Sequence, residues 1–177
     1  MSRKKPDRLS IELEVGDVEV TDKWMKILIT SGVIVLVFGK AKGQGRVKPS
    51  VPYSALINRY ALENGVNGCL VAAVIKKESD FIPDAVNPSD PSYGLGQITL
   101  PTAQQFRAET TKAELFDPQI NIELMCKFIA WLEKNGAGMP GAISAYNTGL
   151  QGWRIGNVPN PPNYSEIVKG FMEDLCE

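Results

Sequence analysis

Hydrophobic positions along the chain form two kinds of pattern. A continuous apolar run lies near the N-terminus, and after residue 50 apolar residues recur at helical spacing between stretches rich in Gly, Pro and Asn. Apolar residues three and four positions apart fall on one face of a helix, and the sequence after residue 50 has no strand-like alternation. We therefore predict a mainly α-helical domain over residues 53–177, long enough to bury a core of its own.

Start and stop signals set the limits of these helices. Gly65 follows the first segment as a stop, and Asp117 with Pro118 combines an N-cap acid with a proline at the first helical position. The prolines between residues 80 and 93 predict a loop. The expected helices cover residues 52–64, 67–79, 101–109, 118–135, 140–147 and 163–175.

The apolar run over residues 24–39 reads WMKILITSGVIVLVFG and carries one charge, Lys26. It is short for a membrane span of about 17–25 residues, although Lys26 can extend to the interface and Trp24 can lie there. We interpret the run as a transmembrane or signal-anchor segment, with a buried strand or helix of a small N-terminal domain as the alternative. A cleaved signal peptide is disfavoured, because a long and partly acidic stretch precedes the run.

Two further segments flank the apolar run on its N-terminal and C-terminal sides. Residues 1–23 form an N-terminal tail in which SIELEVGDVEVT alternates apolar and acidic residues around Gly16-Asp17, a hairpin signal. Residues 40–52, KAKGQGRVKPSVP, have no apolar period, so we predict a linker there. Lys and Arg are more numerous just after the apolar run than just before it, which leans toward a cytoplasmic C-terminal part.

The amino-acid composition excludes several kinds of partner, metal site and catalytic mechanism. The net charge of -1 is too balanced to predict a nucleic-acid partner, and the absence of histidine excludes a histidine-based catalytic triad or metal site. Cys69, Cys126 and Cys176 are too few for a four-thiolate zinc site. Because they are far apart and odd in number, we expect no disulfide framework. No metal or cofactor is predicted, so acid–base chemistry near neutral pH has to use carboxylates, lysines or tyrosines.

Glu78 is the carboxylate with the strongest chemical signal. It follows the apolar stretch 70–75, at the end of a helix that should be mostly buried. A glutamate that loses solvation there holds its proton to higher pH, as a general acid for glycosidic bond cleavage must. The alternative is a solvated glutamate paired with Lys76 or Lys77.

Four blocks of sequence, in order, resemble the catalytic domain of the soluble lytic transglycosylase family. The first runs from Glu78-Ser79 through a loop to Gly94-Leu95-Gly96-Gln97 and residues 100–103, and the others are residues 117–132, residues 142–149 and a closing tyrosine segment over 163–168. The resemblance covers about residues 53–172. It implies the goose-lysozyme-like helical fold and cleavage of the glycan strands of peptidoglycan, without a cofactor.

The resemblance also implies residue roles. Glu78 would be the single catalytic acid/base, protonating the oxygen between N-acetylmuramic acid and N-acetylglucosamine and then taking a proton from the muramoyl 6-hydroxyl, to leave a 1,6-anhydro end. Ser79, Gln97, Tyr146 and Asn147 would line the substrate cleft, and Tyr164 would orient Glu78. The alternatives are that Gln97 braces its loop, that Asn147 fixes the turn before Gly149, and that Tyr164 is a packed surface tyrosine.

Two positions depart from the related patterns. Gly96 stands where the family commonly has methionine, which would widen the cleft or loosen its loop. Thr99 stands where goose-type lysozymes, which hydrolyse, often have aspartate; this favours the anhydro product, a glycosidic bond lyase reaction. A hydrolytic muramidase, using Asp80, Asp84 or Asp90 to activate water, and a non-catalytic glycan-binding assembly protein are the alternatives.

Peptidoglycan as the partner places the domain outside the cytoplasm. We therefore expect a membrane-anchored protein whose catalytic domain faces the periplasm or cell wall, held by residues 24–39. This conflicts with the lysine bias after that segment. Either the bias is overridden, or the protein belongs to a phage or a secretion machine, in which case it would be associated with a virion or with that machine.

Overall fold

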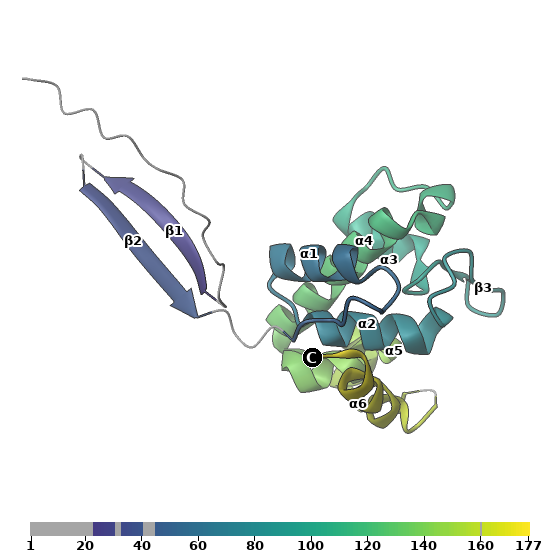
Figure 1. The fold of residues 1–177 in the computed structure, drawn as a ribbon. Helices are drawn as coiled ribbons and strands as arrows, with labels where there is room; N and C mark the ends of the chain where they lie inside the picture. The colour runs from purple at the N-terminus through teal and green to yellow at the C-terminus, as the bar shows by residue number, and fades with distance from the viewer. Residues whose placement is uncertain (1–22, 31–32, 41–44, 160) are drawn as a thin grey trace, which may run out of the picture. The chain divides into compact units, whose positions relative to one another are not determined.

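The structure is a computed structural model that describes residues 23–30, 33–40, 45–159 and 161–177. It divides into two compact units, residues 1–42 and 43–177, which are described separately. Figure 1 shows strands in the first unit and mostly helices in the second. The predicted hairpin around Gly16-Asp17 lies outside the described residues.

The N-terminal unit contains an antiparallel pair of strands, β1 (Lys23–Thr30) and β2 (Val33–Lys40). Lys23 pairs with Lys40 at one end and Thr30 with Val33 at the other. The structure shows strands over the described residues of this segment, as in the strand alternative, and no helix there; the transmembrane or signal-anchor role of residues 24–39 stays a prediction. The physical reason is that Ile, Val and Thr are frequent in both halves, and their β-branched side chains favour extended backbone. Among the residues that the structure describes, no helix combines the length and apolar character needed to span a membrane.

The C-terminal unit is mainly helical, as predicted. Its helices are α1 (Ser54–Asn64), α2 (Gly68–Ser79), α3 (Leu100–Phe106), α4 (Pro118–Leu132), α5 (Gly138–Arg154) and α6 (Tyr164–Leu175), with a 3-10 turn η1 (Ala113–Phe116) and a π segment η2 (Glu133–Ala137). The predicted start at Asp117 is confirmed, because its side chain accepts hydrogen bonds from the backbone N–H groups of Gln119 and Ile120. α5 is longer than expected and kinks at Gly149, where φ is 71°.

The expectation of no strand after residue 50 is wrong. Three two-residue strands, β3 (Val86–Asn87), β4 (Ser92–Tyr93) and β5 (Ile98–Thr99), form an antiparallel sheet in the order β3-β4-β5. Strands this short carry no alternation that a sequence pattern can register. Their effect is to fold the loop after α2 back on itself.

The expectation of no disulfide is also wrong. Cys69, at the start of α2, is bonded to Cys176, near the C-terminus, and Cys126 is a buried free thiol. Residues 45–52 of the predicted linker belong to this same region. Val47 is fully buried and forms a backbone bridge with Cys176, and the Asn58 side chain bonds both the N–H and the C=O of Val47. Large sequence separation did not prevent pairing, because the fold brings the two cysteines together.

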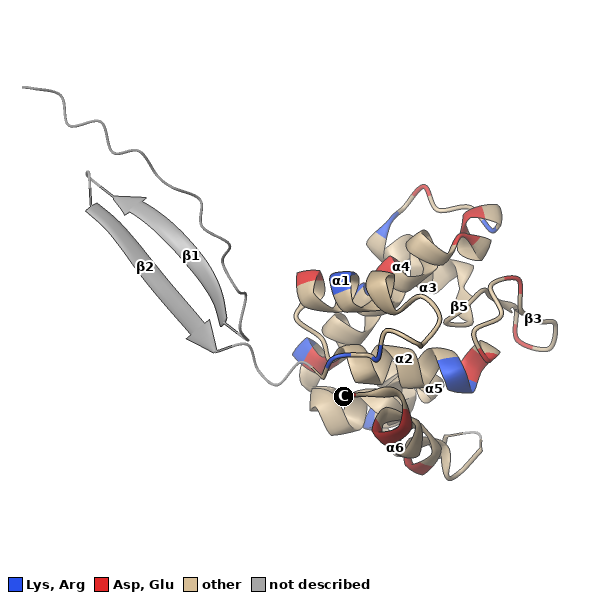
Figure 2. Ribbon diagram, viewed as in Figure 1, with Lys and Arg blue, Asp and Glu red and all other residues tan. Residues whose placement is uncertain are grey.

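Helix α2 runs through the centre of the core. Every residue from Leu70 to Ile75 is at most 1% exposed, and α6 and α1 pack against the helix. Asn67 caps its start by accepting from the N–H groups of Cys69 and Leu70. In Figure 2 the ribbon of α2 is free of charged residues until its last turn. The packing of α2 therefore fixes the position of Glu78 in the last turn of this helix.

Candidate active site

Glu78 is half-buried in the last turn of α2, and its carboxylate accepts a hydrogen bond from a residue of α6. Tyr164, the first residue of α6, donates its hydroxyl hydrogen to Glu78 Oε1 at 2.5 Å. Burial raises the pKa of Glu78 above its ordinary value, and the Tyr164 bond and the Lys77 charge oppose that rise. The net effect favours the protonated acid at a pH where an exposed glutamate is ionised.

Tyr164 is fully buried, which contradicts the alternative of a packed surface tyrosine. Burial and the neighbouring Glu78 carboxylate hold the pKa of Tyr164 far above its usual range, so it remains a hydroxyl donor. The Lys77 ammonium lies 5.7 Å from the centre of the Tyr164 ring. Among the ion pairs of the described residues, Lys76 pairs with Asp80 and none includes Glu78. The alternative of a lysine-paired glutamate is therefore wrong.

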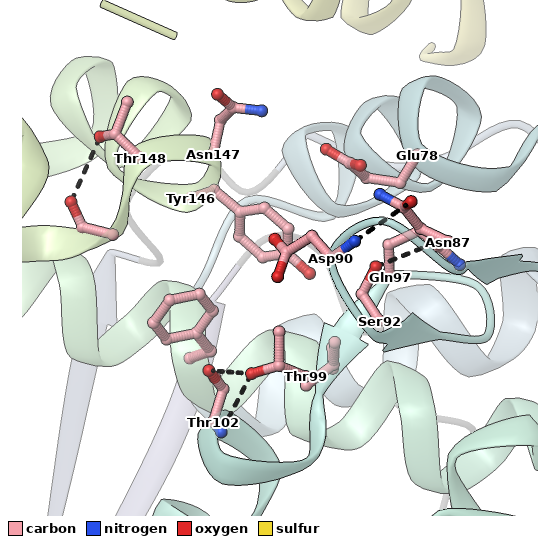
Figure 3. Close-up of a pocket in the computed structure, with 13 residues that line it drawn as sticks. Glu78, Asn87, Asp90, Ser92, Gln97, Thr99, Thr102, Tyr146, Asn147 and Thr148 are labelled. Carbon is pink, nitrogen blue, oxygen red and sulfur yellow. Dashed lines mark hydrogen bonds between the residues drawn. The ribbon is translucent and has the colours of Figure 1, made fainter. Parts of the chain in front are cut away.

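A polar cavity of about 360 Å³ opens beside Glu78. Of the predicted cleft residues, Gln97, Tyr146 and Asn147 line it together with Glu78, and Figure 3 shows these side chains around a common space. Asn147 is exposed and Tyr146 is half-buried. These predicted residues come from two of the four sequence blocks, far apart along the chain, and line one cavity.

Gln97 lines the cavity and also braces its loop. Its backbone has a left-handed φ of 48°, uncommon for a residue other than glycine. The side-chain Nε2 donates to the carbonyls of Ala85 and Gly94 at 3.1 and 2.9 Å, and Oε1 accepts from Ser92 Oγ at 3.1 Å. These bonds use both N–H donors of the Gln97 side chain and one acceptor site of its oxygen. A ligand would therefore bond the remaining acceptor site, on an amide whose position the loop already fixes.

Ser79 does not line the cavity that holds Tyr146 and Asn147. It is 7% exposed, and its hydroxyl donates to the carbonyls of Leu95 and Ile75 at 2.7 and 3.2 Å. Its hydroxyl therefore ties the end of α2 to the loop that carries Gln97. Ser79 therefore has a positioning contact, and it also lines a second cavity beside Glu78, so its predicted place in the cleft stays a prediction.

Gly96 does not widen the cleft. A Cβ built at Gly96 would overlap the side chain of Met125, a fully buried residue of α4, so Met125 already fills the space beside the loop. The Gly96 carbonyl accepts the Tyr146 hydroxyl at 2.8 Å, and the Tyr146 ring packs 5.3 Å from that of Phe128. Helix α4 therefore supplies the bulk that position 96 lacks.

Asn121 is a residue of the site that the sequence analysis missed. It is fully buried, its Oδ1 accepts from the N–H of Gly96 at 2.8 Å, and its Nδ2 donates to the carbonyls of Tyr93 and Leu115 at 3.0 and 2.8 Å. These three bonds fix the loop on which Gln97 stands. An amide on the apolar face of a predicted helix was the available signal, because such a group is buried only when its bonds are satisfied.

Further groups line the cavity without having been predicted as site residues. They include Asn87, Asp90, Ser92, Thr102 and Phe128. Asp90, named only as a candidate for activating water, is exposed. Among residues 45–159 and 161–177, no group of three or more carboxylates or cysteines is arranged to hold a metal ion.

Comparison with known proteins shows which family the sequence matches. The family model described as the transglycosylase SLT domain matches residues 55–155. Proteins named membrane-bound lytic murein transglycosylase C, from Serratia proteamaculans and Shigella sonnei, are 31% identical over 112 residues, which cover 55% of this chain and 31% of each relative. The chain thus matches about a third of the length of these relatives.

Two solved structures share the fold. An inactive mutant of lytic transglycosylase Slt from Pseudomonas aeruginosa has a TM-score of 0.63 and 21% identity, covering 70% of this chain and 24% of that one. The 70 kDa soluble lytic transglycosylase of Escherichia coli has a TM-score of 0.59 and 19% identity, covering 68% and 23%. Because the family model matches more than half of the sequence and includes Glu78, Gln97 and Tyr146, this chain belongs to the transglycosylase SLT domain family.

Proposed function

We propose that this protein cleaves the β-1,4 bond between N-acetylmuramic acid and N-acetylglucosamine in peptidoglycan, with Glu78 as its single acid/base. The observation that carries the proposal is the Glu78–Tyr164 pair. A half-buried carboxyl of raised pKa is bonded to a buried hydroxyl at the edge of a polar cavity. Such a carboxyl can deliver a proton to a leaving oxygen near neutral pH.

In the first step Glu78 gives its proton to the bridging oxygen as the bond from that oxygen to the muramoyl C1 breaks. N-Acetylglucosamine leaves with the proton, and C1 becomes cation-like, assisted by the substrate's own acetamido group. The Glu78 carboxylate that results keeps the Tyr164 hydroxyl as a donor. A hydrogen bond to the charged form stabilises that carboxylate after its proton has gone.

In the second step the muramoyl 6-hydroxyl attacks C1 and gives its proton to Glu78, which returns the acid to its starting form. The product is a 1,6-anhydro end, and no water is consumed. A nucleophile tethered to the reacting carbon has a high effective concentration, so a second carboxylate is not required to activate it. Gln97, Tyr146 and Asn147 line the cavity where the sugar would lie.

Of the three aspartates considered for the hydrolytic alternative, Asp90 is the one that lines the cavity shared by Glu78, Gln97 and Tyr146. If Asp90 activates water, Asp90→Asn should abolish cleavage. If the 6-hydroxyl is the nucleophile, Asp90→Asn should cleave with the same anhydro product as the unmodified chain. Mass spectrometry of the muropeptides separates the two outcomes, because hydrolysis leaves reducing ends.

We further propose that the domain works outside the cytoplasm. The Cys69–Cys176 disulfide supports this, since disulfides persist mainly in oxidising compartments. The lysine bias that leaned the other way applies to segments flanking membrane helices, whereas residues 23–30 and 33–40 are strands. Attachment to a membrane is supported only by the names of the relatives from Serratia and Shigella. A phage or secretion-machine setting stays a prediction.

The test uses the full chain on purified sacculi, with Glu78→Gln beside it. We expect the unmodified protein to release muropeptides with anhydro ends and Glu78→Gln to lose about 10²–10⁴-fold or more in rate, the usual contribution of a general acid. Circular dichroism should show the same helix content for both. Equal rates for the two proteins would overturn the proposal, and binding of sacculi without cleavage by either would favour the non-catalytic glycan-binding alternative.

A further inference from the structure

A second cavity meets the first at Glu78. It has a volume of about 510 Å³, and the two cavities share Glu78, Asn87, Ser92 and Gln97 as lining residues. The remaining lining residues differ completely. We call the first cavity the α5 arm, with Thr99, Thr102, Phe128 and Asn147, and the second the α2 arm, with Lys76, Lys77, Ala85 and Val86.

The α5 arm combines hydroxyl and amide groups with one aromatic ring. Thr99 and Thr102 bond each other through their hydroxyls at 2.9 Å, and Asn147 is exposed at the arm's edge. The Phe128 ring is held between those of Tyr146 and Trp131, with ring centres 5.3 and 6.2 Å away. A pyranose offers hydroxyls at its edge and C–H groups on its faces, so a fixed ring surrounded by polar groups suits it.

The α2 arm is built from the last turn of α2 and the loop before β3. Lys76 pairs with Asp80 at its border, and Val86, 49% exposed, offers an apolar surface. The loop is fastened to the shared residues, since the Ala85 carbonyl accepts from Gln97 Nε2 at 3.1 Å and from the N–H of Gly94 at 2.9 Å. The position of this arm is therefore fixed by the same glutamine that lines the other.

Both arms reach solvent. Asn147 is exposed in the α5 arm, and Asp80 and Val86 are exposed in the α2 arm. The catalytic carboxyl accordingly stands where two open cavities join. A chain lying through both arms would place an internal glycosidic bond, rather than its terminal one, beside that carboxyl.

We infer that the glycan strand binds on both sides of Glu78 and is cut within its length, so that the enzyme is endo-acting. The inference rests on the proposed function and adds the position of the cut. An enzyme that releases terminal disaccharides holds the strand end against a closed cleft, whereas the α2 and α5 arms both continue to solvent. Repeated internal cuts shorten long strands early and release disaccharides late.

The experiment uses the full chain and glycan strands freed of stem peptides, sorted by length and labelled at one end. Products are separated by size at early time points. We expect labelled fragments of many intermediate lengths before disaccharide accumulates. Disaccharide as the main early product, beside strands of nearly full length, would overturn the inference while leaving the proposed function intact. Failure to cleave strands of any length would instead overturn the proposed function.

A pair of variants tests the α2 arm itself. Val86→Trp places a bulky ring in the arm, and Ile82→Trp, on the same loop and 51% exposed but outside both cavities, is its matched control. We expect Val86→Trp to lower kcat/KM on long strands about tenfold, equivalent to losing one favourable sugar contact. Ile82→Trp should match the unmodified chain, and thermal unfolding should show both variants folded. A folded Val86→Trp protein with unchanged kcat/KM would contradict occupation of this arm.

Discussion

At its first residues, helix α2 is held by a disulfide and a side-chain cap, whereas its last turn carries a half-buried carboxyl held by one tyrosine. Cys69 and Glu78 are nine residues apart on this helix, which corresponds to about 14 Å of helix axis. The first end has a covalent bond to Cys176, which itself forms a backbone bridge with Val47, and the second has side-chain bonds to the Leu95 carbonyl and to α6.

The two ends of α2 therefore have different roles, one in stability and the other in chemistry. Contacts at the Cys69 end add stability without approaching the cavity, so changes there should alter unfolding more than chemistry. Contacts at the Glu78 end include a carboxyl whose burial costs free energy, because a charged group is poorly solvated there. Changes at that end should therefore alter activity, pH dependence and stability in different directions.

The largest expected effect on stability comes from removing the disulfide. Replacing both Cys69 and Cys176 by serine opens a closed loop with a sequence separation of 107 and should lower the free energy of unfolding by about 2–5 kcal/mol. Urea denaturation measures this change. Below the melting temperature, kcat/KM on labelled sacculi should stay within about twofold, since the disulfide end is remote from Glu78.

The unmodified chain in a reducing agent is the control for this variant. It should lose the same free energy of unfolding as the double serine variant, and the variant itself should not respond to the reducing agent. Unfolding curves that coincide for the oxidised chain and the double variant would show that this end of α2 does not depend on the bond.

The second prediction concerns stability and the packing of the loop at the Glu78 end. Gly96→Met places a side chain where Met125 already lies and should cost about 1–3 kcal/mol of unfolding free energy through overpacking. Met125→Ala in the same chain removes the conflict and should recover most of that loss. Thermal unfolding of the single and double variants gives the coupling between the two positions.

Gly170→Met is the matched control for Gly96→Met. A Cβ at Gly170, on α6, would meet no atom within 4 Å, so the substitution should leave stability unchanged or slightly raised. Additive effects of Gly96→Met and Met125→Ala would contradict the assignment of Met125 as the group that fills the space beside Gly96.

A smaller effect, on catalysis, is expected from Tyr164→Phe. The buried ring is retained, but the hydrogen bond that lowers the pKa of Glu78 is lost. The pKa of Glu78 should therefore rise, and the high-pH limb of kcat/KM, where the acid loses its proton, should move to higher pH. The rate at the optimum should fall about tenfold, since a bond to a charged group is worth about 1.5–3 kcal/mol at most.

Tyr146→Phe provides the comparison for this shift. Its hydroxyl donates to the Gly96 carbonyl rather than to Glu78, so its loss should lower activity without the same displacement of the high-pH limb. Identical pH profiles for Tyr164→Phe and the unmodified chain would show that the tyrosine does not govern the acid.

The two ends of α2 also differ in how far the sequence predicted them. Glu78 and its burial followed from the apolar stretch before it, and the blocks carrying Gln97 and Tyr146 could be identified by order and spacing. The disulfide was missed because spacing along the chain says nothing about distances after folding. The strand structure of β1 and β2 could not be predicted firmly, since a short apolar run has no period that separates strand from helix.

The sequence also did not predict the direction in which individual side chains point. Ser79 stands beside Glu78 in sequence and was predicted in the cleft, and the sequence did not predict that its hydroxyl also bonds the Leu95 carbonyl. Met125 and Asn121 shape the loop from a helix that the sequence placed correctly but without its contacts. These assignments depend on which elements pack together, which the pattern of a single chain does not determine.

The smallest effect we expect is on the pH dependence of stability in Glu78→Gln. Burial raises the pKa of Glu78 above the ordinary value of 4.5, so the folded chain holds this proton to higher pH than the unfolded chain does. The free energy of unfolding of the unmodified protein should then fall as pH rises from about 4.5 through the raised pKa. Glutamine cannot ionise, so Glu78→Gln should escape that fall and become the more stable protein toward neutral pH.

Urea denaturation of both proteins between about pH 4 and pH 8 measures the difference, in which the other titrating groups cancel. The difference should be near its minimum at the acid end, grow with pH and then level off. Because the Tyr164 bond and the Lys77 charge oppose the effect of burial, its size should increase when Tyr164→Phe is added to both chains. A difference that stays constant across this range would mean that the last turn of α2 holds its carboxyl without electrostatic cost, and the contrast between the two ends of the helix would lose its basis.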